Sequence, residues 1–226
     1  MGKQLFEQSG RAIAIKKHAI TSLKWFCLLL CYAGCQKQPQ SAPATWQDDF
    51  SNPRSGWQRS EDLDTNSYLG YQDQRYLIQA GDRRALLWGL NQAYTFKSSQ
   101  IAVTAYLDAS NPEAGFGVLC GYQDASHFYF FELGADGYYA IVHMQAGEPH
   151  FLAGDSKSTQ LPNQAASYRL QVICTPQILQ MQVGTLTLAS VIPPSAPDGL
   201  IGLLVHTYQR GAARVYFDDL QVVQQP

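Results

Sequence analysis

The fold is decided by residues 115–141, which read GFGVLCGYQDASHFYFFELGADGYYAI. Successive residues of a β-strand point to opposite faces, so Phe116, Val118 and Cys120 share one face of a predicted strand. Asp136-Gly137 provides a hairpin turn, because glycine tolerates a positive φ there. The stretch therefore predicts antiparallel strands joined by tight turns.

The alternating pattern extends outward from this stretch, from Trp46 to the end of the chain, and no helical period persists. A second hairpin turn is expected at Gly184-Thr185. No repeat of fixed period is visible, which argues against a propeller. We therefore predict an all-β domain over residues 46–226, a two-sheet antiparallel β-sandwich. Its expected strands are residues 75–80, 86–90, 95–108, 116–123, 127–133, 138–145, 168–174, 178–183, 186–191, 200–207 and 214–223.

Two cysteines lie within predicted strands. Cys120 alternates with the apolar side chains of its strand, and Cys174 does so with Tyr168, Leu170 and Val172. Both are therefore expected to point into the core. A Cys120–Cys174 disulfide is the preferred interpretation if the chain is exported. The alternative is two buried free thiols that pack as small hydrophobic side chains.

The N-terminal segment has the features of an export signal. Residues 25–33, WFCLLLCYA, form an apolar run that follows basic residues and is too short to span a membrane. Ala33-Gly34 before Cys35 resembles a bacterial lipobox, although Tyr32 departs from that pattern. We expect a signal peptide over 1–34, lipidation of Cys35, and a flexible tether over 35–45. An ordinary secretory signal or another anchor is the alternative.

Charge excludes one class of partner. The chain carries a formal net charge of -2, but residues 1–34 hold five basic residues and one acidic residue. Without that segment, whose net charge is +4, the remainder carries -6. An acidic domain cannot release phosphate counterions by binding, so no nucleic acid partner is expected. With 46% hydrophobic and 15% charged residues, the chain is also not disordered.

Four segments together carry a resemblance to a known family. They are DDFSNPRSGW (48–57), the stretch at 115–141, YRLQVIC (168–174) and LIGLLVHTYQRGAARVYFDDLQVV (200–223). Through them the chain resembles concanavalin A-like, laminin-G-like jelly-roll domains over nearly all of residues 46–224. That resemblance implies a β-sandwich and, more loosely, recognition of glycans.

Catalytic chemistry finds little support. Retaining glycosidases of this kind of jelly roll carry two carboxylates on one strand face, about 5 Å apart. Here the nearest acidic residues are Glu132 and Asp136. Asp136 falls in the predicted turn, where an aspartate side chain hydrogen-bonds to the backbone. No Gly-x-Ser-x-Gly nucleophile motif occurs. Whether the chain is an enzyme stays open, and a non-catalytic role is favoured.

A structural calcium ion is one hypothesis for the acidic strand ends. Asp48 and Asp49 open the first strand, and Asp218 and Asp219 lie in the last. Terminal strands of jelly rolls often run side by side, so Asp49, Asp218 and Asp219 could meet, and calcium prefers such oxygen ligands. The alternative is that these aspartates cap loops and solvate strand ends.

A sugar site needs an aromatic platform beside polar groups. Period-two counting places His127 and Tyr129 on one face and aligns them with Tyr139 and His143 of the next strand. We predict that these four side chains line a concave sheet face, with Trp88 as a further candidate. The alternative is that these aromatic side chains belong to the core.

The sequence thus predicts a membrane-anchored extracytoplasmic lipoprotein of the bacterial cell envelope. Its domain is expected to be a non-catalytic binding module for carbohydrate or envelope polymer. The alternatives are a scaffolding lipoprotein that binds an envelope protein and a glycoside-processing enzyme.

Overall fold

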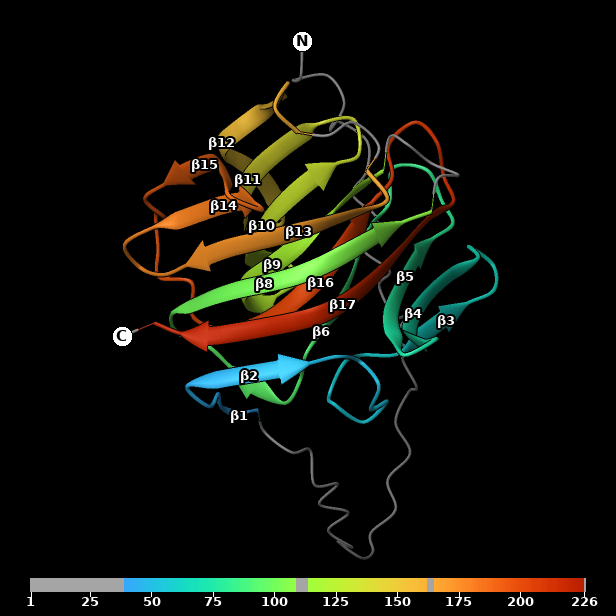
Figure 1. Ribbon diagram of the computed structural model, residues 1–226, viewed down its shortest axis with the longest axis horizontal. Coiled ribbons are helices and arrows are strands. Elements are labelled where there is room, and N and C mark those ends of the chain that lie inside the picture. Colours follow the sequence, from blue (N-terminus) through green and yellow to red (C-terminus); the bar gives the residue numbers. More distant parts are fainter. Residues whose placement is uncertain (1–38, 109–113, 162–164, 226) are drawn as a thin grey trace, which may run out of the picture.

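The computed structural model describes residues 39–108, 114–161 and 165–225, and within these ranges every regular element is a β-strand. All but two short strands form two stacked sheets, with the larger sheet in front in Figure 1. The predicted two-sheet antiparallel sandwich is confirmed. None of the described residues forms a helix with the length and hydropathy needed to cross a membrane.

The six-stranded sheet has the order β12-β11-β10-β9-β16-β6, and its neighbours pair antiparallel. Its centre is the stretch that decides the fold, because β9, β10 and β11 follow one another as hairpins. Its strands are β6 (Leu86–Leu90), β9 (Gly115–Asp124), β10 (His127–Gly134), β11 (Tyr138–Gln145), β12 (Glu148–Lys157) and β16 (Leu200–His206).

The nine-stranded sheet has the order β15-β14-β13-β8-β17-β5-β4-β3, and β2 also pairs with β17. The first and last long segments of the domain therefore lie side by side, as expected, with Asp48 opposite Leu220. Its strands are β2 (Thr45–Asp48), β3 (Ser60–Asp62), β4 (Ser67–Gln72), β5 (Arg75–Ala80), β8 (Ser99–Leu107), β13 (Ser167–Cys174), β14 (Leu179–Val183), β15 (Leu186–Val191) and β17 (Ala213–Gln224).

The ordered domain begins earlier than the composition predicted. Strand β1 (Gln40–Ser41) pairs in parallel with β7 (Tyr94–Thr95), and both β1 and β2 lie at the lower edge of Figure 1. Ala42 is buried, and the side chain of Gln224 donates a hydrogen bond to its carbonyl. The tether predicted over 35–45 is therefore structured from Gln40. These residues are small or polar, and backbone hydrogen bonds hold them in place. Such backbone pairing cannot be predicted from composition.

The main hydrophobic core lies between the sheets. From β9 it receives Phe116, Val118 and Cys120, the face that alternation predicted. The disulfide Cys120–Cys174 lies in this layer and joins β9 to β13, with the two Cα atoms 6.7 Å apart. The predicted disulfide is thus confirmed, and it links one sheet to the other.

Candidate functional site

Two of the predicted sugar-binding side chains lie in the main core. Tyr129 is 2% exposed, and its hydroxyl donates to the carbonyl of Ser195 at 2.9 Å and accepts from the Ser195 amide at 3.1 Å. His143 is 7% exposed, and its ring stacks on that of Tyr129 with centroids 4.3 Å apart. Both side chains point toward the nine-stranded sheet.

The other two predicted sugar-binding side chains, Tyr139 and His127, do not form an exposed platform with the first two. Tyr139 is half-buried and packs against the main core. His127 is exposed, and its Nδ1 lies 3.0 Å from Oδ1 of Asp124. The predicted grouping on one strand face is confirmed by the β10–β11 register, in which Tyr129 is opposite His143. The prediction that this face is open is wrong, because the second sheet covers it.

The acidic strand ends have other partners. Asp48 is buried, and it accepts hydrogen bonds from the Phe50 amide and from the indole of Trp57. The pKa of Asp49 is lowered, mainly by a hydrogen bond from the Ser51 hydroxyl. These two aspartates hold the turn that follows β2.

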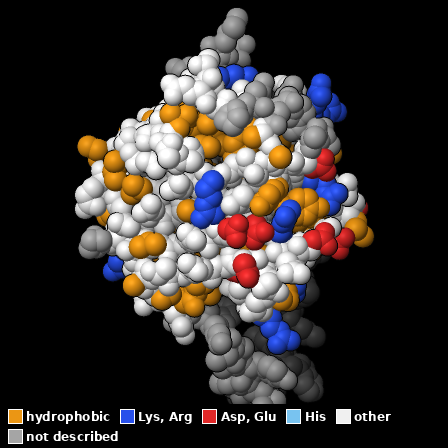
Figure 2. Space-filling model, viewed as in Figure 1, with side chains coloured by type: hydrophobic (Ala, Val, Ile, Leu, Met, Phe, Trp, Pro, Cys, Tyr) orange, Lys and Arg blue, Asp and Glu red, His pale blue; other side chains and the backbone are white. Residues whose placement is uncertain are grey.

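Within β17, Oδ2 of Asp218 lies 3.4 Å from Nε of Arg75. Acidic and basic side chains gather on the face of the molecule that Figure 2 shows. The exposed Asp219 directly follows Asp218. In the part of the chain that the structure describes, no three His, Cys, Asp or Glu side chains are grouped to hold a metal ion. Calcium binding by Asp49, Asp218 and Asp219 stays a prediction, as does lipidation of Cys35, which lies outside the described residues.

The opposite face of the six-stranded sheet, here called the outer face, points away from the main core. It carries a second hydrophobic cluster. In β10 and β11, the members of this cluster alternate with the side chains that point into the main core. Its buried members are Leu90, Leu119, Phe128, Phe130, Ala140, Val142, Met144 and Leu204, and its half-buried members are Leu86, Trp88, Tyr122, Tyr138 and Leu200. The outer face thus has a buried apolar floor and a half-buried aromatic rim.

Three aromatic rings form one end of the outer face, here called the aromatic cluster. The ring of Trp88 lies 5.4 Å from that of Phe128 and 6.4 Å from that of Tyr122, between centroids. Burial raises the pKa of Tyr122, and a hydrogen bond from Trp88 partly offsets that shift. Trp88, one of the predicted ligand residues, therefore lies on this face and apart from Tyr129 and His143.

The other end of the outer face holds a polar cluster of Glu132, His206 and Tyr208. Glu132 is 2% exposed and His206 is 7% exposed. Oε1 of Glu132 lies 3.1 Å from Nδ1 of His206, and the hydroxyl of Tyr208 donates to the same carboxylate. Burial and the negative charge of Glu132 raise the pKa of Tyr208 far above its ordinary value, so this phenol stays neutral.

Glycines in β9 make the polar cluster possible. Glu132 and His206 lie on strands that flank β9, where Gly117 is opposite Glu132 and Gly115 is opposite His206. A Cβ atom at Gly115 would lie 1.9 Å from Oε1 of Glu132. Because neither glycine carries a side chain, the carboxylate and the imidazole meet across the strand. Sequence reasoning missed this site, although the Gly-x-Gly alternation in β9 was a signal for it.

Tyr138 extends the polar cluster toward the edge of the sheet. Its ring packs edge-on against Tyr208, and its hydroxyl donates to Asp155 at 3.2 Å. Burial, followed by the charge of Glu132, raises its pKa strongly. Asp136 accepts from the Tyr138 amide and pairs with Lys157, which fits the turn role expected from its position.

The outer face therefore offers two kinds of contact, one at each end. The half-buried rings of Trp88 and Tyr122 can stack on an apolar ring face. The half-buried Tyr138 and Tyr208 supply phenol hydroxyls, and the buried carboxylate of Glu132 holds Tyr208 in place. Neutral, hydroxyl-rich molecules with one apolar face match both kinds.

Comparison with known proteins shows the fold. No protein-family model and no curated protein matches the chain. Among solved structures, it is similar to the carbohydrate-binding module CBM66 from Bacillus subtilis, with a TM-score of 0.54 and 12% identity over 73% of this chain and 94% of the module. The Bacillus licheniformis β-glucanase gives a TM-score of 0.57 and 8% identity, over 82% of this chain and 100% of the enzyme.

A structure described as a native glycosidic hydrolase gives a TM-score of 0.60 at 9% identity, over 83% of this chain and 99% of that protein. The chain therefore has the concanavalin A-like jelly-roll fold that the sequence predicted. This fold occurs here in both a binding module and hydrolases, so function has to be argued from the site.

Proposed function

We propose that this protein is a non-catalytic, extracytoplasmic carbohydrate-binding module that holds its ligand on the outer face of the six-stranded sheet. One observation carries the proposal. The half-buried rings of Trp88 and Tyr122 lie on the same sheet face as the half-buried hydroxyl of Tyr208, which the buried Glu132 holds in place. Aromatic stacking combined with a few fixed polar groups is the chemistry that sugar recognition requires. The similarity to a carbohydrate-binding module supports the same conclusion.

The test is a glycan array probed with the purified mature protein, followed by affinity measurements on single variants. Trp88→Ala should weaken binding of the best glycan about threefold to tenfold, because it removes an aromatic contact worth about 0.5–1.5 kcal/mol beyond area burial. The matched control is Tyr216→Ala, a half-buried aromatic in β17 of the other sheet, which should leave affinity unchanged. If no glycan binds the wild type, the proposal fails and the protein-interaction alternative gains support.

Membrane anchoring through a lipidated Cys35 is part of the proposal. The disulfide supports an oxidising compartment outside the cytoplasm. Only residues 36–39 separate Cys35 from β1 at Gln40, a span of at most about 18 Å, so an anchored domain stays close to the membrane. The wild type should incorporate a fatty-acid probe and sediment with membranes, and Cys35→Ala should do neither. A labelled Cys35→Ala variant would contradict the anchor.

A glycoside-processing enzyme is the second candidate. It is favoured by the buried Glu132, whose carboxylate contacts both His206 and Tyr208. A carboxyl group in such a setting can exchange a proton with a substrate. Release of reducing ends from the array's best glycan, abolished in Glu132→Gln, would establish the enzyme. Binding without hydrolysis would contradict the enzyme and support the non-catalytic binding module.

A further inference from the structure

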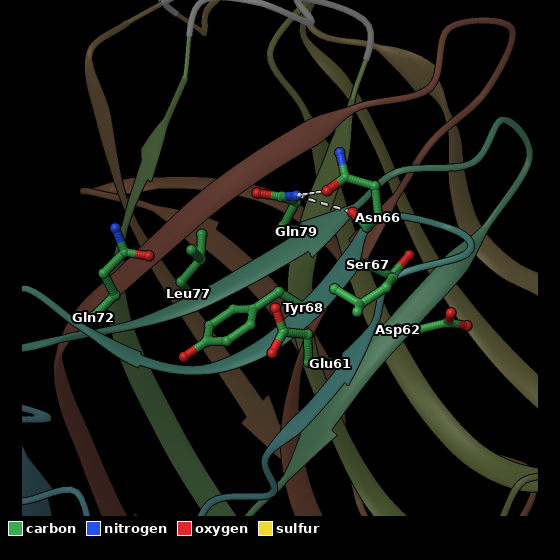
Figure 3. Close-up of a pocket in the computed structure, with 9 residues that line it drawn as sticks. Glu61, Asp62, Asn66, Ser67, Tyr68, Gln72, Leu77 and Gln79 are labelled. Atoms are coloured by element: carbon green, nitrogen blue, oxygen red, sulfur yellow. Dashed lines mark hydrogen bonds between the residues drawn. The ribbon is translucent and has the colours of Figure 1, made fainter.

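A pocket opens on the nine-stranded sheet, whereas the outer face belongs to the six-stranded sheet. It lies over β3, β4 and β5 and has a volume of about 280 Å³ (Figure 3). Ligand pockets usually measure about 300–1,000 Å³, so this one suits a single ring and not an extended chain. The residues that carry its chemistry are Glu61, Asn66, Tyr68, Gln72, Leu77 and Gln79.

Strand register builds the floor of this pocket. Glu61, Tyr68 and Gln79 are opposite one another across the three strands, so their side chains stand in one row. In the next row Gly70 is opposite Leu77. A Cβ atom at Gly70 would lie 2.6 Å from the hydroxyl of Tyr68, so the tyrosine ring occupies the space that the glycine leaves. The pocket therefore has an aromatic ring beside an apolar side chain.

Part of the polar rim is held in place before any ligand arrives. The side-chain amide of Gln79 donates to the carbonyl of Asn66 at 2.9 Å and to its side-chain oxygen at 3.1 Å, as the dashed lines in Figure 3 show. Oδ1 of Asp62 accepts from the amides of Asp64 and Thr65 and so holds the β3–β4 turn. Fixed polar groups lose little conformational freedom on binding, which favours affinity.

Charge selects the class of ligand. The lining contains two carboxylates, Glu61 and Asp62, and among its described residues no Lys, Arg or His. An anionic ligand would be repelled. An ammonium group would pair with Glu61, but it offers no acceptor to the amide NH₂ groups of Gln72 and Asn66. Sugar hydroxyls both donate and accept, so a neutral sugar satisfies the carboxylate and the amides together.

We propose that this pocket is a second glycan site, separate from the outer face, that takes one neutral hexose or N-acetylhexosamine residue. The inference rests on the proposed carbohydrate-binding function and extends it to two sites on different sheets. The sugar ring stacks on Tyr68 while Glu61 accepts hydrogen bonds from adjacent hydroxyls. Two such sites would let one molecule hold two chains, or two points of one chain, with a gain in avidity.

The experiment maps backbone amide shifts by NMR in the mature protein. The probes are glucose, galactose and N-acetylglucosamine, with glucuronate as the anionic counterpart of glucose. Neutral sugars should shift the amides of Glu61, Tyr68 and Gln79, and glucuronate should not. Glu61→Gln should weaken the response roughly threefold to tenfold, since it removes a charged acceptor. Glu148→Gln, an exposed carboxylate on β12, is the matched control and should change nothing.

Each outcome decides between the two proposals. If no neutral sugar shifts the three pocket amides up to its solubility limit, or if Glu61→Gln responds as the wild type does, the pocket inference is wrong. Array binding that depends on Trp88 would then still support the outer face. Pocket shifts that follow the expected pattern, with array binding unchanged by Trp88→Ala, would support the pocket and refute the outer-face site. No response in either assay refutes both.

Discussion

The two faces of the β10–β11 hairpin carry similar side chains in different environments. One face presents Tyr129, Tyr139 and His143 to the nine-stranded sheet, where they belong to the main core. The outer face presents Phe128 and Glu132, which lie in or beside the second cluster. Each face has aromatic rings beside an ionisable group, so chemistry alone does not distinguish core from site. The exposed fraction distinguishes them, because the outer face also carries the half-buried Trp88 and Tyr208, whereas Tyr129 and His143 are buried.

The largest difference between the two faces is expected when Tyr129 is truncated. Tyr129→Ala removes a buried ring and leaves the backbone groups of Ser195 without their partner, so it should destabilise the fold by about 3–5 kcal/mol. Trp88→Ala on the outer face should cost about 1–2 kcal/mol, because the ring is half-buried. Chemical denaturation of both variants measures the difference. Equal losses would mean that the two faces are equally part of the core.

The disulfide sharpens the contrast, because it ties the inner layer of the six-stranded sheet to the other sheet. Replacing Cys120 and Cys174 together by alanine should lower the free energy of unfolding by about 2–4 kcal/mol, since the cross-link spans 54 residues of the unfolded chain. Urea denaturation with and without reductant provides the measurement. Reductant should destabilise the wild type and leave the double variant unaffected, and an insensitive wild type would contradict the prediction.

The polar cluster tests the outer face itself. Glu132→Gln keeps the shape of the side chain but removes the charge that His206 and Tyr208 contact, and we expect a loss of about 1–3 kcal/mol. Exposed Glu148→Gln is the control and should stay within about 0.5 kcal/mol of the wild type. Thermal denaturation compares the two. A Glu132→Gln variant with unchanged stability would show that the charge of Glu132 contributes nothing to folding.

The smallest expected effect is a pH dependence that arises from the inner face. Burial, followed by the charges of His150 and His127, lowers the pKa of His143. The unfolded chain therefore takes up this proton first as the pH falls below about 6.5, so the stability contributed by neutral His143 decreases in that range. His143→Gln should flatten the stability profile between neutral and mildly acidic pH. A profile identical to that of the wild type would contradict the assignment.

Much of the fold could be predicted because alternation in a strand is a local property. Alternation within residues 115–141 and within 168–174 reveals which side chains share a face, and this placed Cys120 and Cys174 in the core. Strand β12 was missed, because Gly154 and Pro149 interrupt its pattern and its pairing with β11 shifts register twice. Strands β3 and β4 were missed as well, and with them the pocket they form.

By itself, the sequence determined the all-β class, the hairpins and the partition of side chains between two faces, since each depends on period-two alternation and on nearby turn residues. It could not determine which face of the six-stranded sheet packs against the second sheet, because that depends on strands more distant in the chain. Nor could it bring Glu132 to His206, which are 74 residues apart and meet across β9, where Gly115 leaves space for the carboxylate. Tertiary structure decided these points, because burial and long-range contact follow from how the two sheets stack.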